Sequence, residues 1–189
     1  MSHRDMQSDL EAIHPDCFGW ALTCCGWRRD EAEEVLQASY LKALDGRARF
    51  DERSSLRTWF FGVVKRTAAE HRRRRSTRAL GIGRWLSNRP AAEPAPTPET
   101  VSHVAEDRRR LRRLLSRLPG RQRELLHLVF YQEMTIEQAA GVLAISTGSA
   151  RTHYARGKAR MREWLAHAEK DHEERRQDRT ASARTVCGG

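Results

Sequence analysis

The fold of this chain is decided by residues 134–165, which read MTIEQAAGVLAISTGSARTHYARGKARMREWL. Thr135 can cap a short helix, because its hydroxyl can accept a hydrogen bond from an unpaired backbone N–H. The next apolar residues recur at helical spacing; they are Ile136, Ala139, Ala140 and Leu143. Ser146 offers a second cap, and a basic helix follows it. Two short helices around a three-residue turn predict a helix-turn-helix, which places its second helix in the DNA major groove.

The second helix of this motif has an apolar and a polar face. Its inner face is expected to hold Ala150, Tyr154, Gly157, Met161 and Leu165. The candidate DNA-binding residues are Ser146, Thr147, Ser149, Arg151, Thr152, His153 and Arg156. The alternative is an αα-hairpin in an ordinary helical bundle, whose polar face is merely solvated. His153 is interpreted as a groove contact or a surface residue rather than a ligand.

Composition favours a polyanionic partner. The chain has 189 residues, room for one or two small domains, a net charge of +10 and a pI of about 10.3. Such a charge attracts nucleic acid above all. Most of the basic residues are arginines, which suit phosphate and guanine recognition, although a GC-rich genome would also enrich arginine.

Several other classes of protein are disfavoured. No apolar run reaches the roughly 20 residues of a membrane span, and the N-terminus lacks an apolar signal core, so no membrane insertion and a cytoplasmic location are expected. No C-x-x-C pair or clustered catalytic constellation occurs, so no metal and no cofactor are expected, and the protein is interpreted as a non-enzyme. Cys17, Cys24 and Cys25 fit a helical core, whereas Cys187 lies in a polar tail.

The N-terminal half predicts a helical unit over residues 13–75. Gly26 is expected to end one helix, and Asp30 with Glu33 resembles a capping box that starts the next. Gly46 ends that second helix, and residues 45–55 form a charged loop. Ser54 or Ser55 can cap a third helix, which runs from Leu56 into four consecutive arginines that end at Arg75. These arginines make a dense phosphate-binding surface, or simply a solvated basic helix end.

The rest of the chain divides by composition. Residues 76–104 crowd four prolines together and predict a flexible linker, because proline lacks an N–H and resists helix formation. Residues 105–166 form the second helical unit, which contains the helix-turn-helix. Residues 167–189 are a polar tail, expected to be disordered past about Arg176. The fold class is therefore all-α, with two small helical domains joined by a Pro-rich linker.

These features together resemble a bacterial RNA polymerase sigma factor of the extracytoplasmic-function class. The stretch Glu31–Gln37 is similar to the core-binding helix of that family, and Leu56–Phe60 followed by the arginines looks like its DNA-melting segment. Leu118–Glu124 and the helix-turn-helix look like its promoter-recognition domain. Departures include Val63–Arg66 for the usual Ile-Ala-Arg-Asn and Ala144 for the usual turn glycine. The promoter sequence therefore stays undefined.

The resemblance implies three contact sets. Core polymerase would meet Glu31, Glu33, Glu34, Gln37 and Leu41. The opened minus-ten element would meet Arg49, Arg53, Arg66, Arg72 and Arg73. The seven candidate residues of the helix-turn-helix would read the minus-thirty-five element. Expected partners are thus core RNA polymerase and promoter DNA. An anti-sigma factor is a further candidate partner, because such factors often hold members of this class inactive, and the tail after Ala166 is the alternative form of control.

Two other functions compete with this interpretation. A polymerase-independent helix-turn-helix regulator would need a dimer interface or a sensor domain, and neither is evident in the sequence. A nucleic-acid-processing enzyme would need clustered carboxylates or a metal site. The residues Glu31, Glu33 and Glu34 are spaced for a helix cap rather than for two metal ions.

Overall fold

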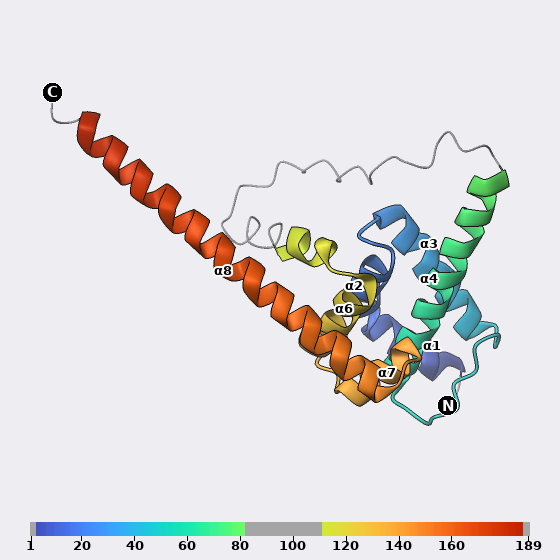
Figure 1. Ribbon diagram of the computed structural model, residues 1–189. Coiled ribbons are helices and arrows are strands. Elements are labelled where there is room, and N and C mark those ends of the chain that lie inside the picture. The colour runs from blue at the N-terminus through green and yellow to red at the C-terminus, as the bar shows by residue number, and fades with distance from the viewer. Residues whose placement is uncertain (1–2, 82–110, 187–189) are drawn as a thin grey trace.

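The computed structural model describes the backbone of residues 3–81 and 111–186, and the side chains of residues 6–77 and 111–167. Every regular element in these ranges is a helix (Figure 1). The N-terminal unit contains α1 (His3–Ala12), α2 (His14–Cys24), α3 (Arg29–Leu44) and α4 (Leu56–Gly81). The C-terminal unit contains a helix over residues 111–117, α6 (Gly120–Leu126), the π-helical turn η1 (His127–Tyr131), α7 (Ile136–Leu143) and α8 (Thr147–Val186). The predicted all-α fold class is confirmed.

The N-terminal unit packs α2, α3 and α4 around aromatic side chains. Trp20, Phe60 and Phe61 are fully buried, and the Trp20 indole N–H donates to the Phe61 carbonyl at 2.9 Å. The inner face of α3 contributes Val35 and Leu36, which are almost fully buried. The three cysteines that the sequence places in this core are buried free thiols; they are Cys17, Cys24 and Cys25. Burial raises the pKa of the Cys17 thiol to about 12, so it stays protonated and unreactive.

The helix ends of this unit follow the sequence in part. Gly26 and Gly46 take positive φ angles of 64° and 75° after α2 and α3, as expected of helix stops. Ser55 caps α4 by accepting a hydrogen bond from the Thr58 N–H at 3.2 Å. The capping box predicted for Asp30 and Glu33 is wrong, because α3 begins at Arg29 and no side chain caps it. The Glu33 carboxylate instead accepts a hydrogen bond from the Arg29 guanidinium at 2.8 Å.

The C-terminal unit contains the predicted helix-turn-helix. Thr135 and Gln138 form a reciprocal capping box, with N–O distances of 3.1 Å and 2.9 Å. Ala144 closes α7 in the left-handed conformation at φ 51°, the position where glycine is most common. Ser146 accepts a hydrogen bond from the Ser149 N–H at 3.2 Å and starts α8. Ala150 is fully buried, as its inner-face assignment requires, whereas Leu165, which the sequence assigns to the same face, is 40% exposed.

Two predicted boundaries change. Helix α4 continues to Gly81, so the start of the predicted linker 76–104 is helical, and its part from 82 onward lies outside the described residues. Helix α8 continues to Val186, so the disorder predicted past about Arg176 is wrong. The physical reason is that residues 167–186 contain no glycine or proline and are rich in residues that favour helix.

The two units lie directly against each other in Figure 1, where α7 lies beside the beginning of α4. Helix α6 also contacts α2. The buried apolar residues of both units form one continuous cluster, which extends from Leu10 to Ala150. In the described ranges, no helix is both long enough and apolar enough to cross a membrane.

Candidate nucleic-acid and partner-binding surfaces

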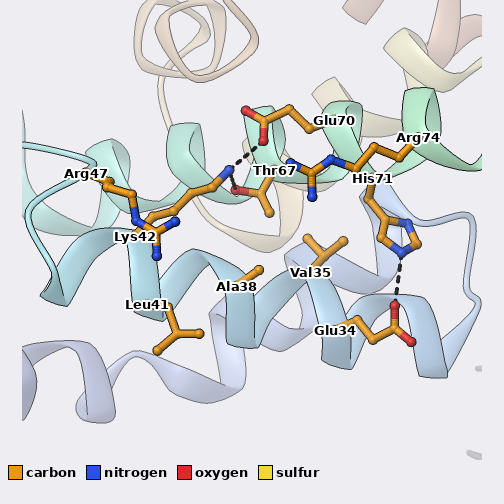
Figure 2. A pocket seen from close by; sticks show the side chains of 10 residues that line it. All are labelled: Glu34, Val35, Ala38, Leu41, Lys42, Arg47, Thr67, Glu70, His71 and Arg74. Carbon is orange, nitrogen blue, oxygen red and sulfur yellow. Dashed lines mark hydrogen bonds and ion pairs between the residues drawn. The ribbon is translucent and has the colours of Figure 1, made fainter.

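The exposed face of α3 carries the residues expected to bind a protein partner. Glu33, Glu34, Gln37 and Leu41 are exposed, and Leu41 keeps 55% of its surface accessible. Between this face and α4 runs a groove of about 220 Å³, with Val35 and Ala38 at its floor (Figure 2). Leu41 thus lines a groove that has an apolar floor.

Charged side chains line the upper wall of this groove. The Lys42 ammonium donates to the Glu70 carboxylate at 2.7 Å and to the Thr67 hydroxyl at 3.1 Å (Figure 2). The hydrogen bond from Lys42 lowers the pKa of Glu70. The groove therefore combines an apolar floor with a fixed ion pair that ties α3 to α4.

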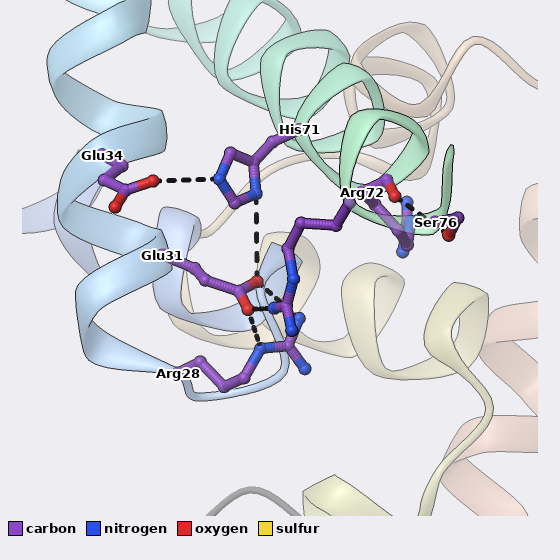
Figure 3. Close-up of polar contacts among 7 residues, drawn as sticks. Arg28, Glu31, Glu34, His71, Arg72 and Ser76 are labelled. Carbon is purple, nitrogen blue, oxygen red and sulfur yellow. Dashed lines mark hydrogen bonds and ion pairs between the residues drawn. The ribbon is translucent and has the colours of Figure 1, made fainter. Parts of the chain in front are cut away.

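Glu31 has a different environment from the other acidic residues of α3. Its side chain is only 14% exposed, and its carboxylate pairs with the guanidinium groups of Arg28 and Arg75 (Figure 3). The ring of His71 lies between Glu31 and Glu34, with its Nε2 at 3.0 Å from the Glu34 carboxylate. Glu31 is therefore largely occupied inside the molecule, where it anchors the arginine-rich end of α4.

The five residues expected to meet the minus-ten element are all exposed but do not converge on one point. Arg49 and Arg53 lie in the loop before α4, whereas Arg72 and Arg73 lie more than four helical turns along it. Arg66 and Arg73 share one face of the helix because they are seven residues apart. The sequence-predicted set is thus a basic track along α4 rather than a pocket.

Aromatic packing holds the loop in place at the start of this track. The Trp59 indole N–H donates to the Arg49 carbonyl at 2.9 Å, and the Trp59 ring lies 5.2 Å from that of Phe50. These contacts hold the backbone of Arg49 against the first turn of α4. The sequence did not single out Phe50, although an aromatic residue in a charged loop is a usable signal.

The seven candidate residues of the helix-turn-helix lie at the start of α8 with different exposures. Five are exposed; they are Ser146, Ser149, Arg151, Thr152 and Arg156. Thr147 and His153 are half-buried. The His153 Nδ1 atom is buried and finds no hydrogen-bond partner among the described residues, so this ring is turned partly into the unit. The Arg151 guanidinium donates to the Glu137 carboxylate of α7 at 3.1 Å, which holds it near the turn.

The described part of the chain contains no candidate metal site. No group of three or more histidine, cysteine, aspartate or glutamate side chains is placed there to hold an ion. What the arrangement offers is one acidic and apolar face on α3, a basic track on α4 and a polar, basic face on α8.

Comparisons with known proteins match both units in the same order. The family model for sigma-70 region 2 matches residues 10–78, and that for sigma-70 region 4 matches residues 108–161. The ECF RNA polymerase sigma factor SigX of Bacillus subtilis is 27% identical over 140 residues, which cover 72% of each chain. The sigma factor EcfG of Rhodopseudomonas palustris is 24% identical over 157 residues, which cover 82% of each chain. The chain covers only 34% of a further relative, the probable RNA polymerase sigma factor RfaY of Xanthomonas campestris.

The fold is also found in solved structures. The sigma factor RpoE of Bartonella quintana, solved with the anti-sigma factor NepR, superposes with a TM-score of 0.72 at 21% identity and covers 86% of this chain and 98% of its own. CnrH, solved with the cytosolic domain of CnrY, superposes with a TM-score of 0.58 at 20% identity. It covers 87% of this chain and 90% of its own.

Proposed function

The chain belongs to the sigma-70 family and is a sigma factor of the extracytoplasmic-function class, and we propose that its three exposed faces divide the work of promoter recognition. The α3 face binds core RNA polymerase, the basic track on α4 holds the opened minus-ten strand, and α8 reads the minus-thirty-five duplex. RNA synthesis itself stays with polymerase, and the protein acts where polymerase does, in the cytoplasm. The observation that carries the proposal is that sigma-70 regions 2 and 4 match the two helical units in that order along the chain.

Within the α3 face, the contacts favour a division of roles. Glu34, Gln37 and Leu41 are exposed beside the groove and are suited to touch polymerase. Glu31 is suited to position α4 instead, because its carboxylate is occupied by Arg28 and Arg75. The proposal therefore assigns direct contact to the first three and an anchoring role to Glu31.

The basic track suits a displaced strand. Phosphate neutralisation by arginines supplies affinity that does not depend on sequence, and aromatic side chains can stack on unpaired bases. Arg49 lies beside the half-buried rings of Phe50 and Trp59, and Arg53 lies in the same loop. Recognition of a flipped base there would offset the few kcal/mol that unstacking costs.

A polymerase-independent regulator is the less favoured function, because a helix-turn-helix alone would not account for a region 2 match over residues 10–78. An anti-sigma factor is a proposed additional partner. Its support is that both structural neighbours were solved in complexes, RpoE with the anti-sigma factor NepR and CnrH with the cytosolic domain of CnrY.

The polymerase-binding role is tested by the double variant Glu34→Arg, Gln37→Ala in the full chain. We expect weaker binding to core polymerase in a titration, with unchanged helix content, because both side chains are exposed on α3. The matched control is Glu163→Arg, which makes the same change of charge at an exposed position on α8. Equal core affinity of the double variant and the control would remove the assignment.

The duplex-reading role is tested with Arg151→Ala and Arg156→Ala. Base contacts concentrate in the first turns of a recognition helix, so Arg151→Ala should relax the ranking of point-mutated upstream elements by about 1–3 kcal/mol. Arg156→Ala should weaken all duplexes evenly and lower the salt dependence of binding by about one charge. An unchanged ranking for Arg151→Ala would contradict its base-reading role.

A further inference from the structure

Two hydroxyl side chains directly follow the run of four arginines near the end of α4. Ser76 and Thr77 are both exposed. The Ser76 hydroxyl donates to the Arg72 carbonyl at 3.1 Å (Figure 3), and the Thr77 hydroxyl donates to the Arg73 carbonyl at 3.1 Å. These bonds run along the backbone of the same helix, and they leave both side chains at the surface of the molecule.

Ser76 lies beside two arginines that the proposed function uses. On a helix, side chains that are three and four residues apart are neighbours, so Ser76 neighbours Arg73 and Arg72. The Arg75 guanidinium is already paired with Glu31. By contrast, neither Arg72 nor Arg73 forms an ion pair with a carboxylate of the described residues, and both are exposed. These two guanidinium groups are therefore accessible to an anion.

A phosphoryl group on Ser76 would be such an anion. It carries a charge of about −1.5 to −2 at pH 7, and beside an arginine cluster it forms about one to three charge-assisted hydrogen bonds. Arginine binds phosphate through two parallel N–H donors, so the guanidinium groups of Arg72 and Arg73 are suited to hold it. Guanidinium groups that hold this phosphate are no longer available to the phosphates of a DNA strand.

The surroundings of Ser76 suit a protein kinase as the source of this group. Kinases select their substrates by the pattern of charge around the acceptor. The arginine run before Ser76 is complementary to a kinase whose substrate groove is acidic. Helix α4 ends at Gly81, less than two turns beyond Ser76. Because helix ends fray, this stretch can enter the active site of a kinase while the buried part of α4 stays in place.

We propose that Ser76 is a phosphorylation site, and that its phosphate withdraws Arg72 and Arg73 from the minus-ten strand. The kinase transfers the γ-phosphoryl group of ATP. The Ser76 oxygen forms a bond to phosphorus, the bond from phosphorus to the bridging oxygen of ADP breaks, and the hydroxyl proton passes to a base of the kinase. The site itself does not depend on the proposed function, whereas its effect on DNA rests on the proposed function of the basic track.

The loss of two phosphate contacts sets the size of the effect. Each contact with a single strand contributes about 0.7 to the slope of log affinity against log salt concentration, so two contacts contribute about 1.4. At about 0.15 M salt, this difference corresponds to an affinity that is lower by about tenfold.

The first measurement identifies the acceptor. The full-length chain is incubated with ATP, Mg²⁺ and a purified serine kinase that requires arginines before its acceptor, and mass spectrometry locates the phosphate. Ser116 is the matched comparison, because it is exposed and also has arginines three and four positions before it, but leucines in between. Ser76 should be modified faster than Ser116, both in the wild type and in Thr77→Ala. Equal rates at the two serines, or modification of Thr77 in place of Ser76, would overturn the site.

The second measurement determines what the phosphate does. Ser76→phosphoserine and Ser116→phosphoserine are made in the full-length chain, and binding of an oligothymidylate single strand is titrated at two salt concentrations. Phosphate at position 76 should weaken binding by about tenfold and lower the salt slope by about 1.4. The same charge at position 116, away from the basic track, should have a smaller effect on both. Equal effects at the two positions would overturn the proposal.

The double variant Arg72→Ala, Arg73→Ala separates this proposal from the proposed function. If the double variant loses affinity and Ser76→phosphoserine does not, the role of the phosphate is wrong while the basic track stands. If neither change lowers affinity, the basic track is wrong as well. Ser76→Ala should bind like the wild type, because the hydroxyl itself is not a DNA contact, and unchanged helix content in every variant shows that the fold is kept.

Discussion

The interior of the N-terminal unit is apolar, whereas the surface on which the two units meet adds buried polar contacts to the shared apolar cluster. We call it the inter-unit surface, and its polar contacts are made by Thr23, Arg57 and Lys65 with Glu124, His127 and Gln132. Inside the N-terminal unit, Trp20, Phe60 and Phe61 are fully buried among apolar neighbours. Between the units, buried positions include Lys65, Glu124 and Gln132, each of which bonds across to, or receives a bond from, the other unit. Apolar packing does not depend on pairing opposite charges. A buried ion pair does, because loss of either member leaves the other charge buried and unpaired. The first kind of contact holds a fold together, and the second can hold a reversible arrangement.

The largest effect is expected inside a unit, from Phe60→Ala. The Phe60 ring is fully buried and stacks on Tyr40 at 5.0 Å, so its removal leaves a cavity that the neighbours cannot fill. We expect the free energy of unfolding to fall by about 3–5 kcal/mol in a denaturant titration. Leu41→Ala is the control, because Leu41 is 55% exposed and its loss should change stability by less than about 0.5 kcal/mol. Similar losses in both variants would contradict the packing described here.

The next effect belongs to the inter-unit surface and depends on pH. Burial lowers the pKa of His127 from 6.5 to about 4, with Asp16 raising it and Arg57 lowering it to a smaller extent. As the pH falls, the exposed ring of the unfolded chain takes up a proton near pH 6.5, whereas the buried ring of the folded chain does so only near pH 4. The contribution of His127 is therefore complete above pH 6.5 and is lost progressively toward pH 4, by up to about 3 kcal/mol.

Unfolding free energies of the wild type and of His127→Gln, measured between pH 5 and pH 7, check this expectation. The wild type should lose stability across that range more steeply than the variant, because glutamine does not titrate. Parallel stability curves for the two proteins would show that His127 is not buried in a neutral form.

The sequence could predict which residues fill the interior of each unit, but not the contacts of the inter-unit surface. The reason is how far apart along the chain the contacting residues are. Caps and faces such as Thr135 with Gln138 are local, and the spacing of residues determines them. Lys65 and Glu124 are 59 positions apart, and Thr23 and His127 are 104 apart. Nothing in the periodicity of either helix pairs them. The same reason explains why the sequence assigned Glu31 to an exposed helix face. Its carboxylate pairs with the guanidinium of Arg75, which lies on another helix.

A smaller effect should distinguish two glycines of the C-terminal unit. A Cβ atom on Gly157 would lie 3.2 Å from Gln122 Cβ and 3.3 Å from Leu126 Cδ1, because α8 approaches α6 closely there. Overpacking of this kind costs roughly 1–3 kcal/mol and outweighs the gain of up to about 1 kcal/mol in helix propensity. Gly157→Ala should therefore destabilise the protein by about 1 kcal/mol in thermal unfolding.

Gly141→Ala is the matched variant, since nothing lies within 4 Å of its added Cβ atom. Gly141 lies inside α7, so this substitution should stabilise the protein by about 0.5–1 kcal/mol through helix propensity alone. The two alanines are thus expected to act in opposite directions. Stabilisation by both would mean that α8 packs less tightly on α6 than described.

The smallest effect is expected from a surface ion pair that has the same chemistry as the buried one. The Arg29 guanidinium lies 2.8 Å from the Glu33 carboxylate, but the side chains are 69% and 53% exposed. Water and salt screen such a pair, and side-chain entropy opposes it, so the coupling energy between Arg29 and Glu33 should be only about 0.3–0.5 kcal/mol, less at high salt. A double-mutant cycle with Glu33→Ala, set beside the cycle for Lys65 and Glu124, measures both coupling energies on one scale. Equal couplings would mean that burial adds nothing at the inter-unit surface, and the contrast between the two kinds of contact would then fail.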